Sequence, residues 1–325
     1  MAMAIVAAKP GGPEVLEWRG IETRQPGPDE VLLRQTAVGV NFLDTYYRSG
    51  LYPWPPGEPL IPGGEAAGVV EAVGKDVKGL AIGDRVAYTT PLGAYREERV
   101  MKAERLVKLP PEVSDEVAAA IMLKGLTAHY LLHRTFAVRS GHYVLFHAAA
   151  GGVGLIAGQW LAALGAIAIG TVGTPEKAAL ARRHGYAHVI NYKTEDFVAR
   201  VAEITEGKGV HVVYDSVGKD TYRGSLKSLR RLGHFVSFGQ SSGMITDFKL
   251  SDLASHGSLS ATRPVLFDYI STPGELEQAA DALFAEIVSS RIMVQVHQTF
   301  PLRDAAEAHR QVESRSTVGS TVLLP

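Results

Sequence analysis

Residues 144–154 read Val-Leu-Phe-His-Ala-Ala-Ala-Gly-Gly-Val-Gly, and this stretch decides the fold. An apolar strand leads into a turn of small residues, and an apolar helix begins beyond it. Gly151 and Gly154 fall on the last two glycines of the pattern G-x-G-x-x-G, and Ala149 falls on the first. Gly151 lets a pyrophosphate approach the amides of a helix N-terminus, and Gly154 lets the helix pack on the strand. The alternative is a tight turn with a purely structural role.

Strands and helices alternate after this stretch. Apolar, β-branched segments at 166–172, 189–191, 210–215 and 234–238 are separated by segments of helical period. The alternation predicts an α/β fold with a Rossmann-type doubly wound parallel sheet, which binds a dinucleotide. A further strand near Leu259–Thr262 leaves an unpaired sheet edge, so we expect a homodimer joined through these domains.

The first third of the chain has a different pattern. Short β segments broken by turn residues predict a compact, mostly antiparallel β-barrel, with strands at 31–36, 66–73, 85–88, 95–100 and 106–108. The two helices and the strand that follow Arg263 are too few to bury a core of their own. We therefore expect residues 1–126 and 264–325 to form one discontinuous domain, into which residues 127–263 are inserted.

Composition excludes several classes of function. The 325 residues include 33 Lys and Arg against 34 Asp and Glu, so the net charge of −1 argues against a nucleic-acid partner. The chain has no cysteine, which excludes disulfides and thiolate-bound metals. No apolar run reaches the length of a signal peptide or a membrane span, so we expect a cytoplasmic protein.

The end of the strand after the glycine-rich turn indicates which dinucleotide is bound. Enzymes that use NAD usually place a carboxylate there, on the ribose 2′-hydroxyl. Here Gly173 leaves room, and Lys177 can reach a 2′-phosphate one helical turn later, which predicts NADPH. Two alternatives stay open, because Glu176 could be the displaced carboxylate and Lys177 an ordinary surface cation.

Further motifs resemble the medium-chain dehydrogenase/reductase superfamily and, within it, the zeta-crystallin-like quinone oxidoreductases. Besides the glycine-rich turn, the resemblance is carried by Gly11–Leu16, Gly39–Tyr46, Gly64–Gly68, Gly83–Val86, Tyr214–Gly218 and Thr262–Pro264. It implies that the β-barrel domain is GroES-like. Zinc alcohol dehydrogenases of the superfamily have a cysteine ligand at the position of Asn41 and a histidine ligand at that of Gly64. The resemblance therefore implies a site without zinc or another metal.

The resemblance also implies the residues of the site. Around the nicotinamide and the acceptor it places Asn41, Tyr46, Tyr52 and Thr127. For the tyrosines the alternative is ordinary packing, and Arg263 could either polarise an oxyanion or hold a domain junction. The implied cofactor-binding residues are Asn41, Thr127, Ala149, Ala150, Gly151, Gly152, Val153, Gly173, Lys177, Tyr192, Ser216, Phe238, Gly239, Ser241 and Arg315.

Two polar residues near these motifs invite a catalytic role. We expect His147, in a buried turn, to be a hydrogen-bonded structural residue, and Asp44 to accept backbone hydrogen bonds rather than to donate a proton.

These expectations favour an enzyme that transfers hydride from NADPH to a quinone without a metal ion. A double-bond reductase acting on enones or alkenals is the first alternative, since both reactions deliver hydride to an electrophile conjugated with a carbonyl. A regulatory or structural protein that binds NADPH without major turnover is the alternative from another class.

Overall fold

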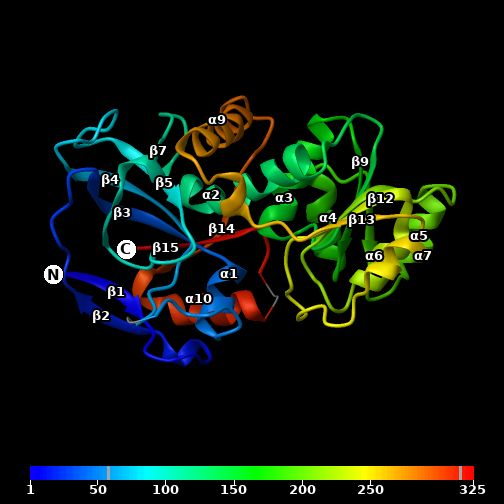
Figure 1. Cartoon of the computed structure of the whole chain (residues 1–325), viewed down its shortest axis with the longest axis horizontal. Helices are drawn as coiled ribbons and strands as arrows, with labels where there is room; N and C mark the ends of the chain where they lie inside the picture. Colours follow the sequence, from blue (N-terminus) through cyan, green and yellow to red (C-terminus); the bar gives the residue numbers. More distant parts are fainter. Residues whose placement is uncertain (57–58, 315–316) are drawn as a thin grey trace. The chain divides into compact units, whose positions relative to one another are not determined.

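The computed structural model describes residues 1–56, 59–314 and 317–325. The chain divides into two compact units, and both of its ends belong to unit 1 (Figure 1). Unit 1 comprises Met1–Leu126, Ile270–Val288 and Val294–Pro325, and unit 2 comprises Thr127–Tyr269 and Ser289–Met293.

Unit 2 is built on a six-stranded parallel sheet with the order β10-β9-β8-β11-β12-β13 (Figure 1). The chain starts at the central strand β8, builds outward to β10, and then returns to build the other half, which is the Rossmann order. The predicted doubly wound fold is therefore confirmed. The strands are β8 (Tyr143–Phe146), β9 (Ile167–Val172), β10 (His188–Asn191), β11 (Val210–Asp215), β12 (Leu229–Ser237) and β13 (Ser260–Thr262).

The core of unit 2 lies against this sheet. Leu145, Ile169 and Val213, one from each of three adjacent strands, are fully buried. Polar side chains begin the crossover helices, since the Thr174 hydroxyl caps α4 and the Asp196 carboxylate caps α5. The helices are α3 (Gly152–Ala163), α4 (Pro175–Arg183), α5 (Phe197–Ile204), α6 (Tyr222–Ser228), α7 (Leu250–Ser255) and α8 (Leu266–Tyr269).

Unit 1 contains a sheet with the order β14-β15-β3-β4-β5-β7, and β6 also pairs with β3. All pairs are antiparallel except β14 with β15, as expected for this domain. The C-terminal strand pairs with β3 through Thr321 and Val40, so the tail joins the sheet of the first third. The strands are β3 (Glu30–Val40), β4 (Glu65–Val73), β5 (Arg85–Thr89), β6 (Glu98–Lys102), β7 (Val107–Lys108), β14 (Val296–Pro301) and β15 (Ser320–Leu324).

A separate antiparallel pair and four longer helices complete unit 1. The pair is β1 (Ala2–Val6) and β2 (Glu17–Ile21), and the helices are α1 (Phe42–Arg48), α2 (Asp115–Tyr130), α9 (Pro273–Val288) and α10 (Ala305–Glu313). Helix α2 continues from unit 1 into unit 2 and ends in a π-helical turn, Leu131–Thr135. Within the described part of the chain, no helix is both long and apolar enough to cross a membrane.

Candidate functional site

The glycine-rich turn leaves the N-terminus of α3 open. Gly151 is the N-cap residue of this helix, and as a glycine it has no side chain that could cap the helix amides. A Cβ atom on Gly154 would lie 2.5 Å from the carbonyl oxygen of Ala148, so only glycine fits there. Uncapped amides and the helix dipole together favour an anion. The turn therefore fits the pyrophosphate of a dinucleotide.

Four predicted cofactor residues lie together where β11 and β12 end. The Ser241 amide donates to the carbonyl oxygen of Ser216, at 3.1 Å. A Cβ atom on Gly239 would lie 2.7 Å from the same oxygen, so these two backbones approach closely. The Phe238 amide donates to the carbonyl oxygen of Asp215. Residues that are distant in the sequence thus lie together at the carboxyl edge of the sheet.

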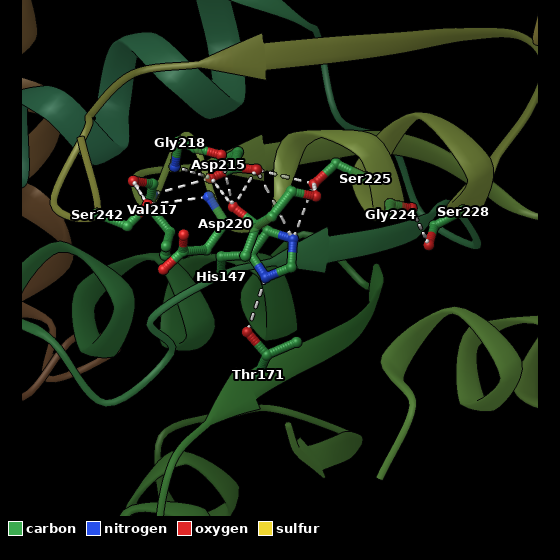
Figure 2. A network of polar contacts seen from close by, with 11 residues as sticks. His147, Thr171, Asp215, Val217, Gly218, Asp220, Gly224, Ser225, Ser228 and Ser242 are labelled. Atoms are coloured by element: carbon green, nitrogen blue, oxygen red, sulfur yellow. Dashed lines mark hydrogen bonds and ion pairs between the residues drawn. The ribbon is translucent and has the colours of Figure 1, made fainter. Parts of the chain in front are cut away.

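A buried polar network supports this edge (Figure 2). His147 Nε2 lies 3.0 Å from Ser225 Oγ, and its Nδ1 lies 2.8 Å from Thr171 Oγ1. The Ser225 hydroxyl donates to Asp215, whose carboxylate also accepts the amides of Val217 and Gly218. Burial lowers the pKa of His147, although the Asp215 charge opposes this. The histidine is hydrogen-bonded through both ring nitrogens, which confirms the expected structural role.

Two lysines gather near the end of β9. A Cβ atom on Gly173 would lie 2.7 Å from the hydroxyl oxygen of Tyr192 and 3.6 Å from Lys193 Cε. Partial burial and the nearby charge of Lys193 lower the pKa of Lys177. The structure therefore brings the predicted residues Gly173, Lys177 and Tyr192 together and adds Lys193. Two ammonium groups beside a small residue fit a phosphate on the ribose.

Glu176 lies on the exposed side of the same turn. Hydrogen bonds from its own backbone amide and from the Thr174 hydroxyl lower the pKa of its carboxyl. The carboxylate is thus engaged at the start of α4, where it also complements the helix dipole.

In unit 1, Asn41 is held by two buried carboxyl groups. Its side-chain Nδ2 donates to Glu65 Oε1 at 2.9 Å, and its backbone amide donates to Asp44 Oδ2 at 2.8 Å. Glu65 also accepts from Lys124 Nζ at 2.5 Å and from the Leu123 amide at 2.6 Å. Burial raises the pKa of Asp44 to about 7, and hydrogen bonds from Asn41 and Tyr95 oppose this. Asp44 accepts a backbone hydrogen bond at the start of α1, as expected.

The remaining predicted site residues differ in burial and in their contacts. Tyr46 and Tyr52 are half-buried, with ring centroids 5.5 Å apart. Thr127 is buried in α2, and the exposed Arg263 donates to the carbonyl oxygen of Ser237. Arg315 lies outside the described residues.

The residues at the two zinc-ligand positions do not fit zinc. Asn41 offers an amide already bound to Glu65, and Gly64 offers no side chain. Leu123 fills the space beside Gly64, because its Cδ1 would lie 2.9 Å from a Cβ atom there. Over residues 1–56, 59–314 and 317–325, no three His, Asp or Glu side chains are grouped so that they could hold a metal ion.

Sequence reasoning missed three residues of these clusters. Lys193 follows Tyr192 directly, and a second lysine after a strand was the available signal. Lys124 and Glu65 are 59 positions apart, and nothing local in the sequence indicates that they form a buried pair.

Comparison with known proteins places both units in one family. Residues 27–111 match the alcohol dehydrogenase GroES-like domain, and residues 152–284 match the zinc-binding dehydrogenase domain. The chain is 53% identical to a quinone oxidoreductase of Pseudomonas aeruginosa, covering 100% of both sequences. It is 49% identical to a 2-haloacrylate reductase of a Burkholderia species, covering 100% of this chain and 99% of the relative. The structure of the Escherichia coli quinone oxidoreductase complexed with NADPH matches with a TM-score of 0.97, at 50% identity over 100% of both chains.

Proposed function

This chain belongs to the quinone oxidoreductases of the medium-chain dehydrogenase/reductase superfamily, and we propose that it transfers hydride from NADPH to quinones. The observation that carries the proposal is the open N-terminus of α3 together with the cluster of Lys177 and Lys193. The first feature suits the pyrophosphate of NADPH, and the second suits its 2′-phosphate.

We propose that the cofactor binds the inserted domain, predicted as residues 127–263, and that the acceptor binds the discontinuous domain, predicted as residues 1–126 and 264–325. The compact units differ from these bounds in that Pro264–Tyr269 and Ser289–Met293 belong to unit 2. The cofactor contacts we propose are those of Thr127, Ala149, Ala150, Gly151, Gly152, Val153, Gly173, Lys177, Tyr192, Ser216, Phe238, Gly239 and Ser241, with Asn41 and Arg315 from the other domain. Lys193 joins this set because its charge acts on Lys177.

NADPH, when bound, supplies a hydride from its nicotinamide ring. The chain's own task is to orient the reactants and to exclude competing reactions. We propose that Asn41 hydrogen-bonds near the nicotinamide, that Tyr46 and Tyr52 offer aromatic faces to a planar acceptor, and that Thr127 lines the same place. Arg263 adds positive charge to this proposed set. The quinone oxygens take their protons from water, so the reaction requires no metal ion.

The assembly and location belong to the same proposal. The outer edge of β13 in the six-stranded sheet supports a homodimer. The cytoplasm is the proposed location. The net charge of −1 favours a small-molecule partner over nucleic acid.

A panel of acceptors tests the proposed activity. Values of kcat/KM are measured with NADPH and p-quinones, enones, 2-haloacrylates and alcohols, and the quinones are expected to give the highest values. Turnover of enones or haloacrylates that exceeds quinone turnover by orders of magnitude would contradict the proposal.

The second candidate is a reductase of conjugated double bonds, which the 2-haloacrylate reductase among the relatives favours. NADPH binding without turnover of any member of the panel would instead indicate a regulatory or structural protein.

A further inference from the structure

A buried ion pair lies beside Asn41. Glu65 begins β4 and is fully buried, and Lys124, on α2, is 5% exposed. Their side chains meet at 2.5 Å, and both belong to unit 1. A charge pair at this depth carries a desolvation penalty that often cancels its attraction. A contribution to the stability of the fold therefore does not by itself account for this ion pair.

The surroundings are shaped to hold the Glu65 carboxylate. Gly39 pairs with Glu65 across β3 and β4, and a Cβ atom on Gly39 would collide with Glu65 Oε1. Oε2 accepts a hydrogen bond from the backbone amide of Leu123, and Oε1 accepts hydrogen bonds from both Lys124 Nζ and Asn41 Nδ2. Three elements thus meet on one carboxylate, and one contact is to a proposed cofactor residue.

The ionised carboxylate determines how the Asn41 amide is turned. A carboxylate only accepts hydrogen bonds, so the NH₂ end of Asn41 must face Glu65, and its oxygen must face elsewhere. A neutral carboxyl or amide at position 65 can donate as well as accept, and Asn41 could then turn over. Lys124 donates to the same Glu65 oxygen that accepts from Asn41, so it holds the oxygen on which the Asn41 amide depends.

We propose that Lys124 is a positioning residue for the reduction site, because it holds the Glu65 carboxylate and so fixes the orientation of the Asn41 amide. This inference rests on the proposed function.

Replacing the charged side chains with neutral ones distinguishes an effect on the orientation of Asn41 from an effect on the stability of the fold. In Lys124→Met the Glu65 carboxyl loses its contact with the Lys124 ammonium group. The double variant Glu65→Gln/Lys124→Met replaces both charged side chains with neutral ones. We expect the double variant to fold, to bind NADPH as the wild type does, and to lose about 10- to 100-fold in kcat.

A control uses a second ion pair between α2 and a strand. Arg85, on β5, contacts Asp115 at 2.6 Å, so Arg85→Met/Asp115→Asn also removes a pair between α2 and the sheet. The control pair is less buried than Glu65 and Lys124, and its removal should leave kcat at the wild-type value.

The split between kcat and KM gives a readout that a purely structural role would not move. In Lys124→Met and in the double variant the loss should fall on kcat, because the Asn41 amide is no longer held in one orientation, while the Kd for NADPH and the KM for the quinone should stay as in the wild type. Asp44 and Tyr95 also face this cluster and are not substituted in either variant.

Wild-type kcat in the folded double variant, or a loss that falls on the Kd for NADPH instead of on kcat, would overturn the proposal. If the wild type reduces no acceptor, the proposed function fails instead, and neutron crystal structures of the variants, which distinguish the amide nitrogen from the oxygen, still decide the orientation of Asn41.

Discussion

At the scale of single residues, we propose that the choice of cofactor depends on charge rather than on shape. Gly173 gives access to the end of β9, and Lys177 and Lys193 place two cations beside it. Sequence spacing predicted Gly173 and Lys177. It did not predict Lys193, because only the pairing of β9 with β10 brings that residue back to Gly173.

Replacing either lysine should therefore act on NADPH and not on NADH. In Lys177→Ala and in Lys193→Ala, the Kd for NADPH should rise about 10- to 100-fold, the equivalent of a lost hydrogen bond to a charged group. The Kd for NADH should stay unchanged, and fluorescence titration measures both constants. Lys208→Ala, which removes an exposed lysine paired with Glu206, is the control. Equal losses for both cofactors would contradict the assignment of the 2′-phosphate.

The buried carboxyl of Asp44 should make stability depend on pH. Its pKa is raised by burial to about 7 in the folded state, above its ordinary value of 3.8. Between these values the folded protein holds a proton that the unfolded chain has lost. The stabilisation is therefore fully present below about pH 4 and is lost as pH rises through about 7.

Asp44→Asn should remove this dependence. The free energy of unfolding of both proteins is measured by urea denaturation from pH 4 to 8. The value for the variant minus the value for the wild type should increase as pH rises. Parallel curves for the two proteins would show that Asp44 does not bind a proton in this range.

At the scale of elements, most strands with an apolar signal were predicted, although the apolar β1 was not, and strands without such a signal were missed. Strands β8, β9 and β11 bury nearly every residue, so their composition alone indicates them. Strand β2 is almost wholly exposed, and β14 has no fully buried residue, so neither shows an alternating pattern. Their place follows from pairing with β1 and β15, which the local sequence does not encode.

The start of α3 offers a direct test of the proposed cofactor site. In Gly154→Ala the new methyl group would meet the backbone oxygens of Ala148 and Ala149 at 2.5 and 2.7 Å, so the turn must shift. We expect a loss of about 1–3 kcal/mol in the free energy of unfolding and weaker NADPH binding.

Gly274→Ala is the control, because no atom lies within 4 Å of a Cβ atom at that position in α9. Unchanged NADPH binding in Gly154→Ala would mean that the turn does not hold the pyrophosphate.

At the scale of the whole molecule, the sequence predicted two domains of different architecture, with a parallel sheet in one and a mostly antiparallel sheet in the other. It could not predict which polar groups meet inside them. Glu65 reaches Asn41 and Lys124 only through the register of β3 with β4 and the packing of α2. Such contacts depend on tertiary packing, and they form much of the proposed reduction site.

The edge strand β13 predicts the state of assembly. We expect light scattering at micromolar concentration to give a mass about twice the 34.9 kDa of one chain. A mass equal to one chain would show that this edge is not covered by a second copy.

The most direct test of hydride transfer to quinones is a single turnover of bound NADPH. The enzyme is mixed with NADPH and then with a p-quinone, and the loss of NADPH absorbance is followed in a stopped-flow instrument. We expect one hydroquinone for each NADPH oxidised, and a slower reaction when the nicotinamide C4 carries deuterium. NADPH that stays reduced in the presence of the quinone, or an oxidation that yields no hydroquinone, would contradict the account.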